Sequence, residues 1–299
     1  MEVKTLAEIF DKAKQKNTLR LAVAAAEDKH VLEAVQSAWK EDIIIPVLIG
    51  DKKSIESICK QISFDISGIE IINEPIPKNA AQKAVSVVKK GNADILMKGM
   101  VSTGVLLKAV LDKESGIRKR EVLSHVAFFE SPYYHKLIAV TDAAMNIAPE
   151  FPEKTAILEN AVEAMHKIGI QNPKVAVLCA VETVNPKMEE TMHAAMLAMM
   201  NRRGQIKGCT IEGPLALDNA VSKEAADHKE IISDVAGDAD LLFTPEIVSG
   251  NILYKAMNFL GGATSAAIIM GAKKPVVLTS RADSEQSKLM SIALAAAMD

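Results

Sequence analysis

The chain has 299 residues, enough for about two domains at roughly 100–200 residues each and enough to bury a core without disulfides or metals. Apolar residues make up 49% and charged residues 24%, which is typical of a globular protein and excludes a disordered chain. With 35 Lys and Arg against 38 Asp and Glu, the net charge of -3 excludes nucleic-acid binding driven by charge over the whole surface.

Short apolar runs alternate with longer amphipathic segments along the first third of the chain. Residues 1–16 predict a charged amphipathic helix and lack the apolar core of a signal peptide. The predicted strands that follow are 21–26, 43–49, 68–72 and 94–97, and the predicted helices are 27–40 and 80–89. Strands that alternate with helices indicate a parallel sheet covered on both faces.

The same alternation continues after a middle stretch. Two strands, 122–130 and 136–141, follow one another without a long helix and are expected to be antiparallel. The helices expected farther on are 154–168, 186–203, 251–260 and 283–298, and the strands are 175–179, 206–211, 240–243 and 275–278.

We therefore predict an α/β protein of two domains, with mainly parallel sheets and helices on both faces. Domain 1 is expected at 1–135 plus 282–299 and domain 2 at 136–281. Ligands of such sheets collect at the carboxyl ends of strands, so the active site is expected in the cleft between the domains.

The cysteines and the most apolar run indicate the compartment. The run Ala263–Ala272 ends at Lys273, well short of the roughly 20 residues that span a membrane, so no membrane contact is expected. Cys59, Cys179 and Cys209 are odd in number and widely spaced, which indicates reduced thiols and a cytoplasmic protein. Cys179 ends a predicted strand, where either a nucleophile or a buried structural cysteine fits.

Several strong motifs are missing. There is no GxGxxG, HExxH or GxSxG, and Val105 and Leu106 stand where a Walker A loop needs Lys and Ser or Thr. The histidines are dispersed and Glu190 with His193 is a single pair, so no metal site is predicted. The helix after Pro186 has a methionine face, interpreted as core or subunit interface: Met188, Met192, Met196, Met199 and Met200.

Two strand ends carry small, polar and cationic residues. In Lys98–Gly104 a Ser-Thr pair opens a helix, where backbone N–H groups and the helix dipole favour an anion, and Lys98 and Lys108 add positive charge. An ordinary helix cap is the alternative. In Thr279–Asp283 a hydroxyl, a guanidinium and a carboxylate share one turn, with an N-cap and salt bridge as the alternative.

At these loops the sequence resembles the phosphate acyltransferases, that is, phosphotransacetylases and phosphotransbutyrylases. The resemblance covers nearly the whole chain and is carried, in order, by Met97–Thr103, Ser124–Glu130, Thr141–Asn146, Glu212–Asp218, Ser249–Lys255 and Leu278–Ser284. Five short motifs make the sequence more similar to the butyryltransferase branch than to the acetyltransferase branch. They are Met-Lys-Gly, Ser-His-Val, Ala-Val-Glu at 180–182, Asn-Pro-Lys at 185–187 and Ser-Arg-Ala-Asp-Ser.

The resemblance implies a fold like that of the isocitrate and isopropylmalate dehydrogenases and a homodimer or higher homo-oligomer. It implies the reversible reaction of an acyl-CoA with phosphate to give acyl phosphate and CoA. The implied substrates are the coenzyme A thioester and phosphate, with no permanently bound cofactor, no metal, no nucleic acid and no membrane. Butyryl-CoA is the expected substrate, and acetyl-CoA or a branched acyl-CoA are the alternatives.

The resemblance also assigns residues. Ser280 and Arg281 match a pair at the CoA thiol and, with Asp283, are the expected catalytic residues. Ser287 stands where acetyl-branch enzymes have the proposed basic aspartate, so the base stays open between Asp283 and His125. Lys108 replaces an arginine that helps to hold phosphate and lacks its bidentate fork. The expected phosphate and acyl contacts are Lys98, Ser102, Thr103, Lys108, Ser124, His125, Asp142 and Asn146, and the CoA contacts are Asn251, Lys255, Ser280 and Arg281.

Two rival functions remain. A dehydrogenase on the related fold would need a nicotinamide site and a group of metal-binding aspartates, and the sequence shows neither pattern. A two-lobed binding protein without catalysis is usually exported, and no signal peptide is evident at the start of the chain. The acyl-chain preference, the oligomeric state and the physiological direction are not readable from the sequence.

Overall fold

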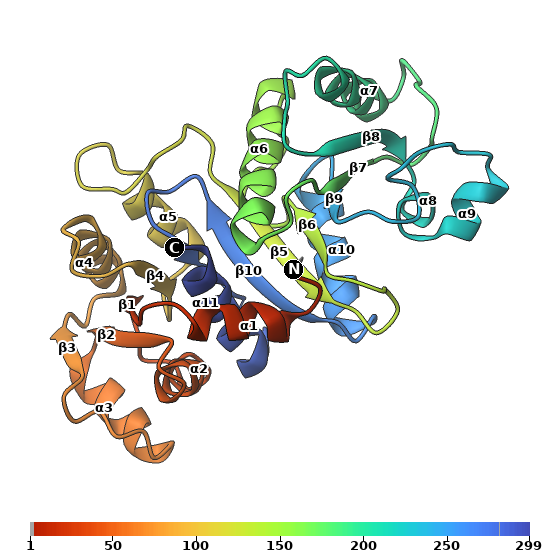
Figure 1. The fold of residues 1–299 in the computed structure, drawn as a ribbon. Helices are drawn as coiled ribbons and strands as arrows, with labels where there is room; N and C mark the ends of the chain where they lie inside the picture. Colours follow the sequence, from red (N-terminus) through yellow and green to blue (C-terminus); the bar gives the residue numbers. More distant parts are fainter. Residues whose placement is uncertain (1–2, 281) are drawn as a thin grey trace. The chain divides into compact units, whose positions relative to one another are not determined.

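The computed structural model describes residues 3–280 and 282–299, and the chain forms two compact units (Figure 1). Unit 1 comprises Met1–Leu6 and Val122–Ser265, and unit 2 comprises Ala7–Glu121 and Ala266–Asp299. The units thus change over after Glu121 and after Ser265, whereas the sequence pattern placed the changes after residues 135 and 281. Residues 127–129 pair with residues 138–140 inside unit 1, and residues 276 and 277 pair with residues 96 and 97 inside unit 2, which moves both changes toward the start of the chain.

Unit 2 is an open sheet with helices on both faces. Its strands are β1 (Leu19–Ala24), β2 (Ile44–Gly50), β3 (Glu70–Asn73), β4 (Ile95–Lys98), β10 (Thr264–Met270, which starts in unit 1) and β11 (Val276–Val277). Its helices are α1 (Leu6–Lys14, whose first residue is in unit 1), α2 (Lys29–Lys40), α3 (Lys52–Gln61), α4 (Pro77–Lys89), α5 (Thr103–Leu111) and α11 (Glu285–Met298). The strand order is β3-β2-β1-β4-β11-β10, parallel except that β10 is antiparallel to β11.

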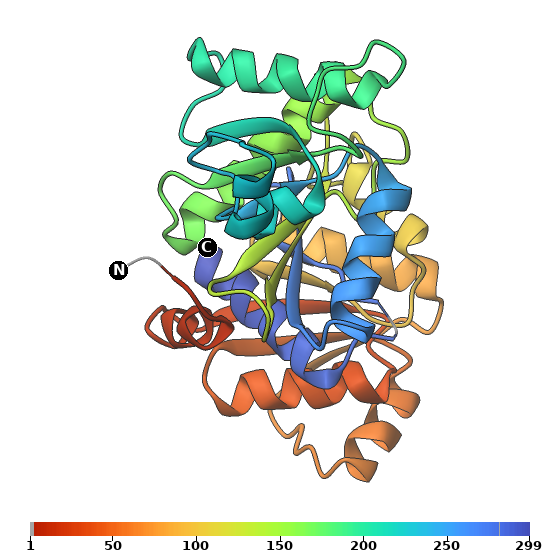
Figure 2. The ribbon, with the colours of Figure 1, turned by 90° about the vertical axis from the view of Figure 1, so that its right-hand side faces the viewer.

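Unit 1 contains the second part of the sheet. Its strands are β5 (Ser124–Glu130), β6 (Ile138–Thr141), β7 (Lys174–Leu178), β8 (Thr210–Leu215) and β9 (Leu241–Phe243), in the order β5-β6-β9-β7-β8. Its helices are α6 (Phe151–Ile168), α7 (Glu189–Arg202), α8 (Leu217–Val221), α9 (Lys223–His228) and α10 (Ile247–Phe259). β5 and β6 are antiparallel, as predicted, and the other pairs are parallel. Helices α6 and α10 lie on opposite sides of β5 and β6 (Figures 1 and 2).

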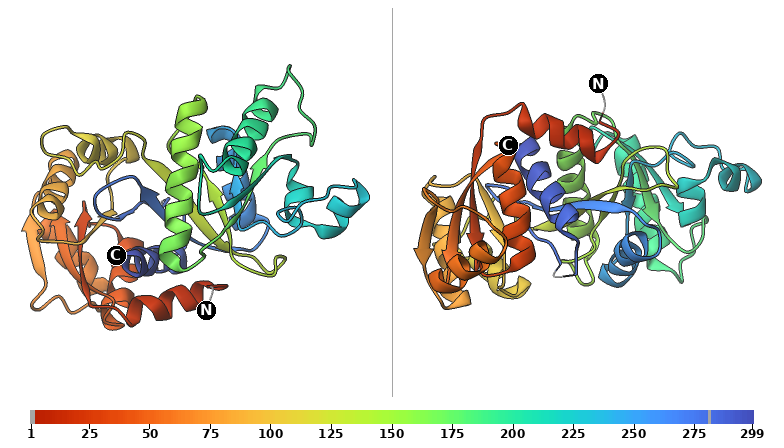
Figure 3. Two further views of the ribbon diagram at one scale, coloured as in Figure 1. Left: turned by 45° about the horizontal axis from the view of Figure 1, so that its top comes forward. Right: turned by 90° about the horizontal axis from the view of Figure 1, so that it is seen from below.

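The apolar runs of the sequence form strands because both faces of each sheet are covered. Positions 21–24 of β1 and all of β5 before Glu130 are buried, so these strands lack an apolar–polar alternation. In unit 2, α2 and α11 pack side by side (Figure 3). Asp28 caps α2 and Asp51 caps α3 by accepting backbone N–H groups, which explains why these helices begin where they do.

Several elements differ from the sequence pattern. The run Ala263–Ala272, considered above only as a membrane candidate, contains strand β10. The strand expected at 206–211 is β8, which starts later, at Thr210, and helix α3 had no predicted counterpart. Among the described residues, no helix is long and apolar enough to cross a membrane. The α/β class itself is as expected.

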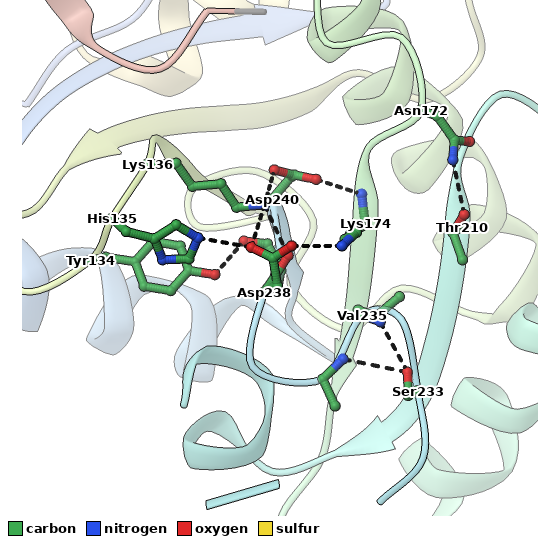
Figure 4. A network of polar contacts seen from close by, with 12 residues as sticks. Tyr134, His135, Lys136, Asn172, Lys174, Thr210, Ser233, Val235, Asp238 and Asp240 are labelled. Carbon is green, nitrogen blue, oxygen red and sulfur yellow. Dashed lines mark hydrogen bonds and ion pairs between the residues drawn. The ribbon is translucent and has the colours of Figure 1, made fainter. Parts of the chain in front are cut away.

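A network of charged side chains joins three strand starts at the amino edge of unit 1 (Figure 4). Lys136 precedes β6, Lys174 begins β7 and Asp240 precedes β9. The Lys136 ammonium lies 2.6 Å from Asp240 Oδ1 and 2.9 Å from Asp238 Oδ1, and Lys174 lies 2.6 Å from Asp238 Oδ2. His135 Nε2 is 2.8 Å from Asp238 Oδ1. Asp238 thus has three cationic or titratable partners.

We expect Asp238→Asn to lower the free energy of unfolding at neutral pH by about 1 kcal/mol, since such exposed pairs each contribute little. Partial burial pushes the Asp238 pKa upward, but hydrogen bonds from Lys174, Lys136 and His135 outweigh it and hold that pKa well below its ordinary value. A depressed carboxyl pKa stabilises the fold above the unfolded-state pKa, near ~3.9, and this stabilisation is lost as pH falls through the folded pKa.

Urea unfolding of the wild type and of Asp238→Asn from pH 7 to pH 3 checks this expectation. The difference between them should be largest at pH 7 and should shrink below about pH 4. Asp227→Asn is the matched control, because Asp227 forms a single exposed pair with Lys223 at 2.7 Å. A difference for Asp238→Asn that stays constant with pH would contradict the ionic origin.

Candidate active site

Unit 2 has a topological switch point between β1 and β4. The chain runs from β1 outward to β2 and β3 and then returns through α4 to β4, on the other side of β1. Ligands of open α/β sheets bind outside the carboxyl ends of the strands at such a point. β11 is parallel to β4 and pairs with it. The two loops singled out in the sequence, 98–104 and 279–283, therefore leave the same edge of the sheet.

The loop after β4 is held against the end of β1. The N–H of Gly99 donates to the Ala24 carbonyl at 2.9 Å and that of Met100 to the Ala25 carbonyl at 2.6 Å. A Cβ on residue 99 would lie 2.0 Å from the Ala25 oxygen, so only glycine fits. Lys98 is 6% exposed, and its ammonium donates to the Gly99 carbonyl at 3.2 Å. A lysine is thus buried beside the switch point.

Helix α5 opens at this loop. Ser102 is its N-cap and accepts the N–H of Val105 at 3.4 Å, and Thr103 is its first residue. An α-helix start combines unsatisfied N–H groups with a favourable dipole for an anion. Lys108 is exposed, lies more than one turn farther along α5 and makes no ion pair with the described residues. The structure brings Ser102 and Thr103 to the edge and leaves Lys108 on the surface.

The loop after β11 is closed by Asp283. The N–H of Ser280 donates to Asp283 Oδ2 at 2.6 Å, and the N–H of Asp283 donates to the Ser280 carbonyl at 3.2 Å. The Ser280 hydroxyl accepts the N–H of Ala282 at 3.3 Å. Asp283 is 8% exposed. Its carboxylate therefore shapes the turn that carries Ser280. Arg281, the third residue predicted here, lies outside the described residues.

Ser287, which stands where the resemblance expects an aspartate, is part of the α11 start. It is 7% exposed, and its N–H donates to the N-cap hydroxyl of Ser284 at 3.1 Å. A serine hydroxyl, unlike a carboxylate, does not act as a base at neutral pH. The carboxylate that contacts Ser280 in this turn is that of Asp283.

In unit 1, Asp142 organises the turn after β6. It is 3% exposed, and its Oδ1 accepts the N–H groups of Ala144 at 2.9 Å and Met145 at 3.1 Å. Its Oδ2 accepts the N–H of Asn146 at 3.3 Å and the Asn146 side-chain amide. That amide also donates to the Leu123 carbonyl at 2.9 Å. Asp142 and Asn146 are therefore brought together, with Asp142 as the acceptor for the whole turn.

Ser124 and His125 lie at the same edge, because β5 begins where its antiparallel neighbour β6 ends. The Ser124 hydroxyl is buried and accepts the Asn160 side-chain amide at 3.0 Å. His125 is 3% exposed, its carbonyl accepts the Thr141 hydroxyl at 2.8 Å, and its ring contacts Tyr254 edge-on, with centroids 5.8 Å apart. Both predicted residues are thus packed inside unit 1.

Helix α10 packs its first turns on the Asp142 turn. A Cβ on Gly250 would lie 2.2 Å from the Asp142 carbonyl oxygen, so the close contact requires glycine. Asn251 donates its side-chain amide to the Ala143 carbonyl at 3.0 Å. The Lys255 ammonium lies 5.7 Å from the ring centre of Tyr254, on the same helix. Asn251 is therefore joined to the turn, and Lys255 lies two turns from the helix start.

A pocket of about 630 Å³ lies along another face of α10. Ile252, Leu253 and Leu217 line it with Met188 and Cys179. Burial, more than the nearby Glu190 charge, raises the pKa of the Cys179 thiol to about 11. The thiol therefore stays protonated at neutral pH, which favours the structural interpretation of Cys179 over the nucleophilic one.

Two charged residues at the edge of unit 2 were not singled out in the sequence. Lys288 is 2% exposed, and its ammonium donates a hydrogen bond to the Asp283 main-chain carbonyl. Glu27 follows β1 and has one buried carboxyl oxygen without a hydrogen-bond partner, and burial raises its pKa. Lys288 has Ser284, Glu285 and Ser291 three or four residues away along the chain, so the sequence carried no signal of its burial. Among the described residues, no group of three or more His, Cys, Asp or Glu side chains is placed to hold a metal ion.

The fold and these loops define an α/β protein with a Ser-Thr helix start and a polar turn at the carboxyl ends of neighbouring strands. Residues 4–77 and 73–296 match the family model described as phosphate acetyl/butaryl transferase. The chain belongs to that family.

Its relatives include both branches. It is 49% identical to the phosphate butyryltransferase of Clostridium acetobutylicum, over 98% of both chains, and 48% identical to the phosphate acetyltransferase of Thermotoga maritima, over 93% of this chain and 94% of that one. A branched-chain phosphotransacylase structure from Enterococcus faecalis is 36% identical, with a TM-score of 0.84, over 94% of this chain and 99% of that one.

The expected dehydrogenase-like fold also has a counterpart. A putative 4-hydroxythreonine-4-phosphate dehydrogenase from Salmonella typhimurium superposes with a TM-score of 0.60 over 95% of this chain and 100% of that one. At 12% identity this likeness concerns the fold alone. The predicted family and fold class are confirmed.

Proposed function

We propose that this chain transfers an acyl group between coenzyme A and phosphate, producing acyl phosphate from acyl-CoA. One observation carries the proposal: the α5 start and the Ser280–Asp283 turn leave the same edge of unit 2, on the paired parallel strands β4 and β11. An anion site and a polar turn on adjacent strands suit a reaction that joins an anion to a thioester. Membership of the family supports it.

In this reaction a phosphate oxygen attacks the thioester carbonyl carbon. The new C–O bond forms as the C–S bond breaks, and CoA leaves as a thiolate that takes up a proton. Both reactants are anions, so cations and backbone donors must hold them together, and orientation alone contributes up to roughly 7–11 kcal/mol in favourable systems. The negative charge that develops on the carbonyl oxygen needs a fixed donor.

We assign roles accordingly. Ser102, Thr103 and Lys98 hold phosphate, because they belong to the α5 start and the strand end before it. Ser280 and Arg281 act at the thioester, and Asp283 or His125 is the proton acceptor. The division into domains at residues 135 and 281, with an active site in the cleft, stays a prediction. The remaining predicted contacts with phosphate, the acyl group or CoA also stay predictions, and they are Lys108, Ser124, Asp142, Asn146, Asn251 and Lys255.

The proton-transfer role of Asp283 has a direct test. Asp283→Asn is expected to slow acyl-CoA formation from acyl phosphate about a hundredfold or more, because a base must then deprotonate the CoA thiol. The opposite direction should lose the same factor in kcat/KM, because a variant cannot change the equilibrium constant and the base of one direction is the acid of the other. Raising the pH should restore part of the lost rate of acyl-CoA formation, since the CoA thiol, with a pKa near ~8.5, then ionises without a base. Initial rates from about pH 7 to about pH 9 measure this, with Asp218→Asn, a residue of helix α8 in unit 1, as control. A loss that does not change with pH would remove Asp283 as the base.

Butyryl-CoA is our proposed substrate, with acetyl-CoA and branched acyl-CoA as the alternatives. Release of CoA thiol from acetyl-, butyryl- and isobutyryl-CoA with phosphate tests the proposal. A pocket that fits the longer chain should favour butyryl over acetyl by about 10-fold or more, since each methylene contributes roughly 1–3 kcal/mol. No release from any short acyl-CoA would refute the proposed function, and a higher kcat/KM for acetyl-CoA would transfer it to the acetyl branch.

We further propose a homodimer or higher homo-oligomer. Helix α10 exposes Val248, Ile252 and Phe259 by 60% or more, and Met196 and Met199 of the methionine face of α7 are about half exposed. Exposed apolar groups of this kind mark interaction surfaces. Light scattering after gel filtration should give at least twice the mass of 32.2 kDa, and a mass of one chain at micromolar concentration would contradict the assembly.

We also propose a cytoplasmic location. Cys59, Cys179 and Cys209 are all free, which suits a reducing compartment, and CoA thioester and phosphate are substrates available there. Cell fractionation followed by immunodetection tests this, and recovery in a membrane or exported fraction would contradict it.

A further inference from the structure

Lys288 is a fully buried cation beneath the Ser280–Asp283 turn. It lies in the first turns of α11 and is 2% exposed, although lysines are almost never buried to this degree unless they are paired. Its ammonium donates a hydrogen bond to the main-chain carbonyl of Asp283. Lys288 is thus bonded to the backbone of the turn. A substitution at residue 283 would therefore leave this hydrogen bond in place.

Two carboxylates from different elements influence this ammonium through their charge. Burial lowers the pKa of Lys288, while the charges of Asp283 and Asp28 raise it. Asp28 is also the N-cap of α2, where its Oδ1 accepts the N–H of Val31 at 2.9 Å. Lys288 thus holds the turn after β11 from α11, the helix that packs beside α2 (Figure 3).

Stability alone does not explain such a residue. Replacing buried ionic groups with apolar ones of similar size is often neutral or stabilising, so a buried ion pair is weak evidence for a stabilising role. The contacts here continue to the predicted catalytic serine: Lys288 holds the Asp283 carbonyl, and the Asp283 carboxylate holds the N–H of Ser280 at 2.6 Å. A displacement of about 1 Å at a reacting group can cost roughly a hundredfold in rate.

We propose that Lys288 is a positioning residue, which fixes the Ser280–Asp283 turn to helix α11 and thereby sets the place of Ser280 for acyl transfer. This inference rests on the proposed function. Lys288 does not touch the reacting atoms; it acts through Asp283.

The main test is Lys288→Met, which keeps the length of the side chain and removes its charge and donor. We expect kcat for CoA release to fall at least about tenfold, with less than about a threefold change in KM for phosphate, because the α5 start is not altered. Lys154→Met is the matched control: Lys154 is 6% exposed in unit 1 and contacts His193. We expect Lys154→Met to leave both kcat and the KM for phosphate within about twofold of the wild type.

A double variant separates positioning from general damage. If Lys288 sets the place of Ser280 through the Asp283 carboxylate, then Lys288→Met adds less than about a threefold loss to Asp283→Ala, which already lacks the acceptor for the Ser280 N–H, although each alone costs much more. Fully multiplicative losses would contradict the coupling. Asp28→Asn is a second variant, which keeps the α2 cap and removes one of the two carboxylate charges that raise the pKa of Lys288. We expect it to lower kcat less than Lys288→Met does.

Amide hydrogen exchange gives a readout that does not depend on activity. Lys288→Met should speed exchange at residues 280–284 at least about tenfold, while Lys154→Met leaves this segment unchanged. Unchanged exchange together with unchanged kcat in Lys288→Met would overturn the inference. If the wild type releases no CoA, the proposed function fails, and the exchange of the same segment still decides whether Lys288 holds the turn.

Discussion

Arg281→Ala is expected to lower kcat/KM for acyl-CoA and phosphate at least about a hundredfold, the cost of one lost donor at a developing oxyanion. Arg281 stands in sequence between Ser280 and Asp283, the two residues joined by the 2.6 Å hydrogen bond of the turn. A guanidinium there keeps its charge at every working pH and offers several N–H donors to a thioester oxygen or to phosphate.

Two companion variants make the Arg281 result specific. Arg281→Lys keeps the charge and loses the planar fork, so its kcat/KM should fall between the wild type and Arg281→Ala. Arg20→Ala is the control, because Arg20 forms an exposed ion pair with Glu70 at 2.7 Å at the amino end of β1 and should leave kcat/KM within about twofold. Near-normal kinetics for Arg281→Ala would remove this residue from the mechanism.

The second large effect is expected from Asp142→Ala, at about 2–4 kcal/mol of unfolding free energy. The carboxylate is 3% exposed and accepts hydrogen bonds from Ala144, Met145 and Asn146, and each hydrogen bond to a charged group contributes roughly 1.5–3 kcal/mol, with part of the loss recovered by relaxation. The turn also receives Asn251 through the Ala143 carbonyl, so we expect kcat/KM to fall at least about tenfold as well.

Denaturant unfolding and steady-state kinetics measure both consequences. Asp112→Ala is a matched control in unit 2: Asp112 Oδ1 accepts the N–H groups of Glu114 at 3.0 Å and Ser115 at 2.7 Å in a similar turn, but it is exposed. We expect it to cost about 1 kcal/mol or less and to leave activity normal, since water replaces the lost acceptor. Equal costs for Asp112→Ala and Asp142→Ala would show that burial is not the cause.

The parts of the fold that were predictable are those set by local patterns. Buried runs such as 21–24 carry apolar residues at every position because both faces of the sheet are covered, and this marks a strand without any knowledge of its neighbours. The loops 98–104 and 279–283 were recognisable from residue types alone. Their meeting at one edge was not, because it depends on the pairing of the two-residue strand β11 with β4.

The parts that escaped prediction depend on contacts between distant segments. Ala263–Ala272 has the apolarity of a buried segment, and only its pairing with neighbouring strands identifies a strand there. Lys288 looks like an ordinary helix lysine, and its burial follows from α11 packing on α2. The sequence did not indicate that the Asp142 carboxylate accepts backbone N–H groups of its own turn, while its contact with a ligand stays a prediction.

The split sequence of unit 2 has a consequence for how the chain is made. The unit begins at Ala7 but is completed only by Ala266–Asp299, which supply β11 beside β4 and α11 against α2. During synthesis the ribosome finishes Val122–Ser265 before these last segments exist, so unit 1 has the opportunity to fold first. Pairing across so long a separation is slow to form. The turn with Ser280 is therefore among the last parts of the chain to be assembled.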